Sequence, residues 1–244
     1  KINNKKIREY AKYADKNNVR KYVEETVGKK YLVKQYFAKK EITPEDIEKL
    51  PNSFVLKTNN GSSSNYIVRD KKKENIEELC SYMNRLVKIK YGYIHGELLY
   101  NKIKPMIVAE KLLLDKKNKI PDDLKCFCFI DNDGNKIKIF YIERVIGDDR
   151  KRIMFDENWE LVDFGCSTFG ELKIKIKKPK NIKEILKVLD KLSSKFNFVR
   201  VDLYVLDDKI YFGELTFIPT AGYLKFDSIE TDILFGSYIG NNLD

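Results

Sequence analysis

Two segments of alternating apolar and polar residues near the C-terminus constrain the fold more than any other feature of the sequence. Residues 198–206 and 209–217 flank Asp207-Asp208, a dipeptide typical of tight turns, so the pattern predicts a β-hairpin. With a three-residue turn over 207–209, Asp202 faces Glu214 across the hairpin, and opposed Cβ atoms lie about 4.5–5.5 Å apart. A two-residue turn shifts this register. In the three-residue register, one face carries Arg200, Asp202, Tyr204, Phe212, Glu214 and Thr216, and the other carries Val199, Val201, Leu203, Val205 and Leu215.

The carboxylates of Asp202 and Glu214, if they face each other, repel unless one is protonated or a cation lies between them. Carboxylate oxygens suit Mg²⁺, which keeps several waters and takes further ligands from nucleotide phosphates. One interpretation of the hairpin is therefore a magnesium–nucleotide site. The other is a surface salt cluster in which Arg200 neutralises both carboxylates.

Lys57 and the loop that follows it form a second candidate site. Residues 54–58 and 65–69 read as two strands, and the loop between them, Asn59–Ser64, is rich in Gly and Ser. Flexible backbone N–H groups and hydroxyls in such a loop can contact phosphate oxygens, and a Lys at the strand end adds a positive charge. An ordinary hairpin with an exposed Lys is the alternative.

The remaining patterns mix helices and strands. Asp15 caps a predicted helix that runs to about Val27 and ends at Gly28. Further helices are expected over 74–91 and 181–196, and strands over 106–110, 125–130, 136–145 and 171–178, the last as an edge strand protected by Lys173, Lys175 and Lys177. Because the elements do not alternate strictly as βαβ units, we expect an α+β fold.

Composition limits the partners of the chain. The 244 residues include 47 Lys+Arg and 37 Asp+Glu, for a net charge of +10, and 43% are hydrophobic, which excludes a disordered chain. A chain of this length buries roughly 70% of its unfolded surface. Since the charges are interleaved along the sequence, we interpret the excess as a basic surface suited to anions: phosphates, acidic sugars or nucleic acid.

The inventory of reactive side chains excludes several chemistries. His95 is the only histidine, and HExxH, GxSxG, P-loop and GxGxxG motifs are absent, which excludes a His-rich metal site and the common hydrolase and nucleotide motifs. Cys80, Cys126, Cys128 and Cys166 form no CxxC pair, so we expect reduced, buried thiols of a cytoplasmic protein. No apolar run approaches the roughly 18–20 residues of a membrane span, and the polar start predicts no signal peptide.

Short motifs spread along the chain match one known family. They are Asp15-Lys16, 19–22, Leu50-Pro51, 54–59 with Gly61-Ser62, Tyr100, 103–105, Glu110, 124–129, 199–204, 210–217, Pro219 and Gly222. Together they resemble the ATP-grasp superfamily, specifically the TupA-like (teichuronopeptide biosynthesis) ATP-grasp proteins found with polysaccharide-assembly genes. The resemblance covers nearly the whole chain and is densest over 199–217.

The resemblance implies the ATP-grasp fold, in which two α+β lobes clamp a nucleotide. It assigns residues 1–50 to a helical N-terminal segment, 51–109 to a small lid lobe and 110–244 to a large catalytic lobe. The implied nucleotide site comprises Lys57 at the α/β phosphates, the loop of Gly61, Ser62 and Ser63 over the triphosphate, and the hinge backbone of Glu110, Lys111, Leu112 and Leu113 at adenine. Asp202 and Glu214 would hold Mg²⁺, with Thr216 where many members have a metal-binding Asn, and Lys125 and Arg144 would stabilise the transferring phosphoryl group and carboxylate. The sequence departs from the family's usual His-Gly-Ser-Gly-like loop, since it has Asn60-Gly-Ser-Ser.

The implied activity is that of an Mg-ATP-dependent carboxylate–amine ligase that forms an amide through an acyl phosphate. Its expected partners are ATP, a carboxylate such as a uronic acid or amino acid, and an amine, in cell-surface or capsular polysaccharide biosynthesis. Two alternatives are an ATP-grasp kinase that phosphorylates a saccharide and, from the charge and the 15 Tyr, a basic nucleic-acid-binding module.

Overall fold

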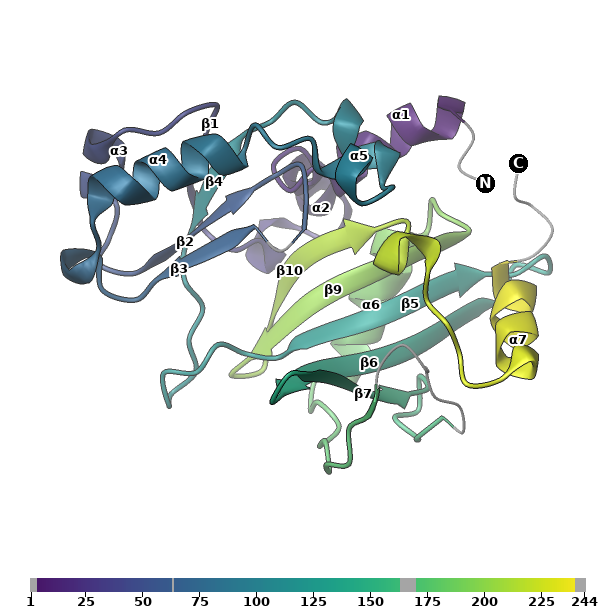
Figure 1. Ribbon diagram of the computed structural model, residues 1–244. Coiled ribbons are helices and arrows are strands. Elements are labelled where there is room, and N and C mark those ends of the chain that lie inside the picture. Colours follow the sequence, from purple (N-terminus) through teal and green to yellow (C-terminus); the bar gives the residue numbers. More distant parts are fainter. Residues whose placement is uncertain (1–3, 63, 163–169, 240–244) are drawn as a thin grey trace. The chain divides into compact units, whose positions relative to one another are not determined.

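The computed structural model describes residues 4–62, 64–162 and 170–239 (Figure 1). The chain divides into two compact units. The N-terminal unit consists of residues 2–24 and 32–114, and the C-terminal unit of residues 25–31 and 115–244. Both contain helices and an antiparallel or largely antiparallel sheet, which confirms the α+β class. The division that we predicted, into an N-terminal segment (1–50), a lid lobe (51–109) and a catalytic lobe (110–244), stays a prediction.

The N-terminal unit has a four-stranded sheet in the order β1-β4-β2-β3, in which every neighbouring pair is antiparallel. The strands are β1 (Gln35–Lys39), β2 (Phe54–Thr58), β3 (Asn65–Val68) and β4 (Ile107–Glu110), and the helices are α1 (Asn4–Ala14), α2 (Val19–Thr26), α3 (Pro44–Glu48), α4 (Ile76–Leu86) and α5 (Tyr91–Ile94), with 3₁₀ turns η2 (Lys71–Lys73) and η3 (Leu98–Lys102). The last two residues of α2 belong to the other unit. The hairpin of β2 and β3 confirms the predicted strands.

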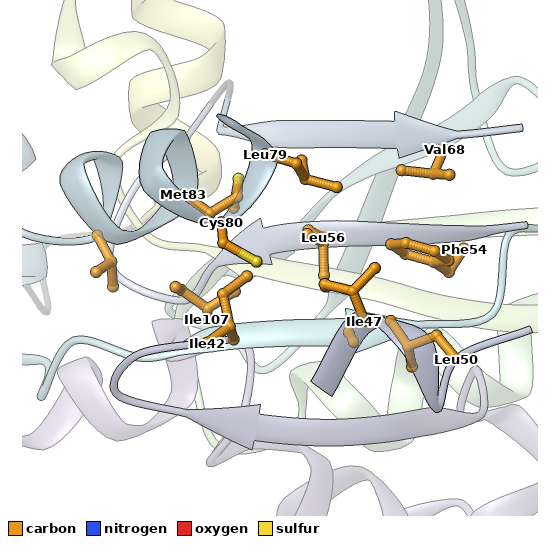
Figure 2. Packing of buried hydrophobic residues seen from close by; sticks show 12 residues of the cluster. Ile42, Ile47, Leu50, Phe54, Leu56, Val68, Leu79, Cys80, Met83 and Ile107 are labelled. Carbon is orange, nitrogen blue, oxygen red and sulfur yellow. The ribbon is translucent and has the colours of Figure 1, made fainter. Parts of the chain in front are cut away.

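Alternation along β2 separates a buried core from the face that carries Lys57. Phe54 and Leu56 are fully buried in a cluster with residues of α3 and α4 (Figure 2). Val55 and Lys57 point to the opposite face, as the period of two requires. The apolar stripe of α4 covers the first face of the sheet, and the second face carries Lys57 and Glu110 together with Val55 and Val108.

The C-terminal unit has a six-stranded sheet in the order β10-β9-β5-β6-β7-β8. The strands are β5 (Asp123–Ile130), β6 (Lys136–Ile146), β7 (Asp149–Phe155), β8 (Gly170–Glu171), β9 (Phe198–Leu206) and β10 (Lys209–Thr216), and the helices are α6 (Ile182–Ser193) and α7 (Ile229–Ile239), with 3₁₀ turns η1 (Lys29–Tyr31) and η4 (Pro219–Gly222). All neighbours are antiparallel except β7 and β8. The hairpin predicted over 198–217 is thus confirmed.

Each face of this larger sheet has its own helix (Figure 1). On one face, Lys138 of β6 forms an ion pair with Asp190 of α6, with 2.8 Å between Nζ and Oδ1. On the other, Phe127 and Tyr141 are buried in a cluster with Phe235 of α7. We call these the α6 face and the α7 face.

Several predictions about secondary structure were wrong in detail. The helix predicted over 74–91 spans only Ile76–Leu86, and strands β1 and β7 were not predicted. Residues 172–178, with Lys173, Lys175 and Lys177, form no strand. Only Gly170 and Glu171 pair with β7, at the predicted sheet edge. An alternating sequence does not make a strand where no partner strand offers hydrogen bonds along its whole length.

The turn before α2 shows how the N-terminal residues fold locally. The Asp15 carboxylate accepts hydrogen bonds from the backbone N–H groups of Asn17 and Asn18, at 2.8 and 3.2 Å, before α2 begins at Val19. Gly28, with φ of 107°, follows the end of the helix, as predicted. Within the described ranges, no helix has the length and apolar character that crossing a bilayer requires.

Candidate active site

Asp202 on β9 and Glu214 on β10 are directly paired across the hairpin, as the sequence predicted. The route to this pairing differs from the prediction. The turn contains two residues, Asp207 and Asp208, both with positive φ (48° and 61°), as in the tight turns that favour hairpins. Lys209 therefore pairs with Leu206, one residue out of the predicted register.

A β-bulge at Gly213 restores the predicted pairing. The register shifts between Phe212 and Glu214, so that Gly213 is the extra residue on β10. A Cβ built on Gly213 would lie 3.0 Å from the Asp202 carbonyl oxygen, a tight contact that glycine avoids. Phe212 pairs with Leu203 and so lies on the α6 face, which corrects its predicted place beside Asp202.

Arg200 connects the two carboxylates. Its guanidinium donates to both oxygens of Asp202, at 2.7 and 2.8 Å, and to Glu214 Oε1 at 2.7 Å. The Arg200 side chain is only 11% exposed and that of Asp202 6%, whereas Glu214 is 24% exposed, so the network is largely buried with Glu214 at its open end. Burial lowers the pKa of Arg200, but the negative charges of Asp202 and Glu214 outweigh it and raise that pKa well above its ordinary value.

Lys125 on β5 brings a second cation to the same carboxylates. Its Nζ lies 2.7 Å from Asp202 Oδ2 and 3.1 Å from Asp123 Oδ2. Burial lowers the pKa of Lys125, but the negative charges of Asp202 and Asp123 raise it by more, so the pKa lies above its ordinary value. Lys125 is therefore held as a cation on the α7 face, where the resemblance implied a charge-stabilising residue.

Two tyrosines complete the α7 face around Lys125. Tyr204 on β9 is paired with Asp123 on β5, and the Tyr204 hydroxyl donates a hydrogen bond to the Asp123 carboxylate. Burial and this nearby negative charge raise the pKa of Tyr204. Tyr141 pairs with Lys125 and is fully buried, which raises its pKa too. Within the described part of the chain, the Tyr141 hydroxyl has no hydrogen-bond partner.

Thr216 lies beside Glu214 at the end of β10. Its Oγ1 donates to Glu214 Oε1 at 3.0 Å, and its side chain is buried. The structure thus brings together all three residues that the resemblance named as metal ligands. The 3₁₀ turn that follows holds Thr220 and Ala221 at positive φ (55° and 53°), a strained backbone of the kind that often lies near functional sites.

The donor set at Asp202 and Glu214 fits a magnesium ion that shares its coordination with a nucleotide. All the available donors are oxygens, which Mg²⁺ prefers, and the ion usually binds one or two carboxylates together with waters and phosphates. In the residues that the structure describes, no group of three or more His, Cys, Asp or Glu side chains offers an all-protein metal cage. The two carboxylates alone match the nucleotide-dependent mode.

Arg144 is not brought to this site. It lies three residues after Tyr141 on β6, a strand without a bulge, so its side chain belongs to the α6 face. There its guanidinium binds the carboxylate of Asp122, with 3.1 Å between Nε and Oδ1. The arginine that contacts both carboxylates is Arg200, which lies two residues before Asp202 on the same strand face.

In the N-terminal unit, Lys57 lies against Glu110. Lys57 Nζ is 2.6 Å from Glu110 Oε2, and Arg20 Nη1 of α2 is 3.1 Å from Glu110 Oε1. Lys57 and Glu110 share the sheet face opposite the α4 core, because β2 and β4 pair Lys57 with Val108 and Val55 with Glu110. A cation at the end of β2 and an acid at the end of β4 are thus adjacent.

The loop after β2 is built around buried polar groups. Asn59 is fully buried and donates to Asp15 Oδ1 at 2.9 Å and to the Lys104 carbonyl at 3.0 Å. Gly61 accepts a hydrogen bond from the Lys16 ammonium, and a Cβ on Gly61 would lie 3.0 Å from the Tyr91 ring. These contacts fix the base of the loop. Ser62 is exposed, and Ser63 lies outside the described residues.

The predicted hinge begins at the end of β4. Glu110 is the last residue of that strand, and the Lys111 N–H donates to the Lys34 carbonyl at 2.8 Å. Leu112 is buried and Leu113 is half-buried. Lys111, Leu112 and Leu113 follow β4 without regular secondary structure.

The remaining reactive side chains lie apart from these two clusters. The His95 ring stacks at 4.3 Å from that of Tyr91. Cys80, Cys126 and Cys128 are buried free thiols, as predicted, and Cys166 lies outside the described residues. Burial and a hydrogen bond with Cys128 raise the pKa of Cys126, so the Cys126 thiol is poorly suited to nucleophilic chemistry.

Comparisons with known proteins agree with the resemblance seen in the sequence. The model of the TupA-like ATP-grasp family matches residues 1–240. Among solved structures, phosphoribosylamine–glycine ligase from Thermotoga maritima gives a TM-score of 0.50 at 17% identity, covering 87% of this chain and 50% of that one. D-alanyl-alanine synthetase A from Vibrio cholerae gives 0.50 at 12% identity, covering 92% and 60%. The chain thus spans about half to three-fifths of these proteins, and the likeness is one of fold. A comparison with curated protein sequences found no match.

Proposed function

Because the chain belongs to the TupA-like ATP-grasp family, we propose that it is an Mg-ATP-dependent carboxylate–amine ligase. The observation that carries this proposal is the buried network of the α7 face. It sets two carboxylates opposite each other and brings Arg200 and Lys125 within 2.7 Å of them. Such a site supplies fixed charges and positions, which is what phosphoryl transfer asks of a protein.

We assign the metal to Asp202 and Glu214. Bound there, Mg²⁺ would neutralise charge on the nucleotide phosphates. Thr216 would hold the Glu214 carboxylate in place through its hydrogen bond. Lys125 and Arg200, which lie against the same carboxylates, would then stabilise charge on the oxygens of the transferring phosphoryl group. Arg200 therefore has the role that the sequence had indicated for Arg144.

We assign the nucleotide to the residues of the N-terminal unit. Lys57 would contact the α/β phosphates, and the loop of Gly61, Ser62 and Ser63 would cover the triphosphate. The backbone of Glu110–Leu113 would pair with adenine. Support comes from the adjacency of Lys57 and Glu110 and from the fixed base of the Gly-Ser loop.

The proposed reaction has two steps. A carboxylate oxygen of the substrate attacks the γ-phosphorus of ATP, the bond to the β,γ-bridging oxygen breaks, and ADP leaves with that electron pair. The amine nitrogen then attacks the acyl carbon, phosphate leaves with the electrons of the C–O bond, and the nitrogen gives a proton to solvent. Lys125 and Arg200 stabilise the charge on the phosphoryl oxygens in the first step and on the departing phosphate in the second.

The substrate class that we propose is an acidic saccharide, such as a uronic acid, or an amino acid joined to one, in a cytoplasmic step of cell-surface or capsular polysaccharide synthesis. The net charge of +10 favours such anions. The experiment is an ADP-release screen with Mg-ATP that crosses uronic acids and amino acids with amines. We expect ADP release that requires both a carboxylate and an amine, and an amide product by mass spectrometry.

The screen also separates the alternatives. A phosphorylated saccharide, formed without any amine, would identify a kinase and contradict the ligase proposal. Tight oligonucleotide binding with a steep salt dependence, together with no ATP turnover on any pair, would favour a nucleic-acid-binding module.

A further inference from the structure

The Glu110 carboxylate has two cationic partners, one for each oxygen. Lys57 Nζ lies 2.6 Å from Oε2 and Arg20 Nη1 lies 3.1 Å from Oε1. The Glu110 side chain is only 9% exposed, so water replaces neither partner. The trio carries a net charge of +1, one cation more than the carboxylate needs.

Among the described residues, the Arg20 side chain makes two polar contacts, whereas the Lys57 side chain makes one. Arg20 Nη2 also donates to the Val33 carbonyl at 2.8 Å, so the planar guanidinium is held at two points. The turn that Asp15 caps sets the start of α2 and thereby the place of Arg20. The Lys57 side chain is a flexible chain that ends in a single ammonium group. In the described part of the chain, Glu110 is the one ion-pair partner of that ammonium.

This difference has a consequence for nucleotide binding. A phosphate that takes Lys57 removes one counter-ion from a buried carboxylate, and a buried charge left alone is costly. With Arg20 in place, Glu110 keeps a charge-assisted hydrogen bond when Lys57 moves. Without Arg20, each contact of Lys57 with a phosphate would leave the buried Glu110 carboxylate without a cationic partner.

We propose that Arg20 is a positioning residue for ATP binding, which holds the Glu110 carboxylate so that Lys57 can leave it for the nucleotide phosphates. The proposal rests on the proposed function, because it takes the ligand of Lys57 to be ATP. It gives the N-terminal segment a part in the nucleotide site, through a side chain that need not touch the nucleotide.

A purely structural role for Arg20 makes a different prediction. If Arg20 only anchors α2 to the sheet, its loss weakens ATP binding through local disorder, and removing the Glu110 charge as well does not help. If Arg20 acts through charge, neutralising Glu110 relieves the defect. The double variant therefore distinguishes the two roles.

The experiment measures Mg-ATP affinity by calorimetry in the full chain for Arg20→Gln, Glu110→Gln and the double variant, with thermal unfolding as the folding check. Lys21→Gln is the matched control, since Lys21 is the next residue on α2, is exposed and loses the same charge. We expect Arg20→Gln to weaken ATP binding about tenfold, the scale of a lost charge-assisted contact. The double variant should return to within about threefold of wild type, and Lys21→Gln should bind like wild type.

Two results would overturn the proposal while leaving the ATP site intact: unchanged affinity in Arg20→Gln, or a defect that Glu110→Gln fails to relieve. If the wild-type chain binds no Mg-ATP at all, the proposed function itself fails, and this inference fails with it. If Arg20→Gln has a low melting temperature, the double variant shows whether misfolding causes the weak binding. A folding defect would persist in the double variant, whereas a charge defect would be relieved there.

Discussion

Glu214 lies directly opposite Asp202 although the turn that joins their strands is one residue shorter than the simplest register requires. The two-residue turn at Asp207 and Asp208 starts the hairpin out of step, and the bulge at Gly213 corrects it before Glu214. Without the bulge, Glu214 would point to the α6 face. The proposed metal site thus depends on a glycine that has no side chain to contribute to it.

Gly213→Ala tests this dependence. The added Cβ would meet the Asp202 carbonyl oxygen at 3.0 Å, so the backbone of β9 or β10 must give by a few tenths of an ångström beside the Asp202–Glu214 pair. We expect ATP turnover to fall at least about tenfold, with a loss of stability of about 1–3 kcal/mol by denaturant unfolding. Gly170→Ala is the control, since its Cβ would meet only Lys151 Cγ at an ordinary 3.5 Å. Equal turnover in the two variants would argue against the role of the bulge.

Lys57→Ala tests the nucleotide assignment. Removing the ammonium takes away the proposed phosphate contact and leaves Glu110 with Arg20, so the fold is preserved. We expect Mg-ATP affinity to fall about tenfold or more by calorimetry, with little change in the melting temperature. An unchanged affinity would remove Lys57 from the nucleotide site.

Asp123→Asn tests how Lys125 is positioned. Asp123 lies 3.1 Å from Lys125 as its second carboxylate partner, so neutralising Asp123 leaves Asp202 as the one ion-pair partner of Lys125 in the described part of the chain. That pairing competes with the metal, and we expect the Mg²⁺ concentration for half-maximal ATP turnover to rise severalfold, about threefold to tenfold. Asp122→Asn is the matched control, because its carboxylate binds Arg144 on the α6 face. A similar magnesium dependence in both variants would contradict this account.

The raised pKa of Lys125 gives a prediction about pH. Asp202 and Asp123 favour its charged form in the folded state, so its contribution to stability is complete below its unfolded pKa of about 10.4 and is lost only as the pH rises through the higher folded value. Between about pH 6 and 9, the stability difference between wild type and Lys125→Met should therefore stay constant in urea unfolding. A difference that shrinks across this range would show that Lys125 deprotonates within it.

The sequence predicted the pairing of Asp202 with Glu214 from a register with a three-residue turn, and it left a two-residue turn open as the alternative. The sequence did not predict the two-residue turn or the bulge at Gly213. Each shifts the register by one residue, so the two shifts cancel at Glu214 but not at Phe212, which precedes the bulge. The available signal was Gly213 itself, because an isolated glycine inside a strand pattern is typical of a β-bulge.

Other errors have equally physical causes. The strand β7, with the sequence Asp149-Arg-Lys-Arg152 at its start, is too charged to be recognised by its pattern, and it exists because β6 offers it a full ladder. Arg144 was placed by motif order, whereas strand alternation sends it away from Lys125. Arg20 could not be linked to Glu110 because the contact joins residues 90 positions apart.

The central claim is that Asp202 and Glu214 form the magnesium site of an ATP-dependent ligase. Its most direct test is Mg-dependent ADP release by Glu214→Gln, with the active substrate pair from the screen, beside Glu171→Gln at the exposed sheet edge. The account predicts that Glu214→Gln loses nearly all turnover while its melting temperature and circular dichroism stay close to wild type, and that Glu171→Gln is fully active. Wild-type turnover in a folded Glu214→Gln variant would contradict it.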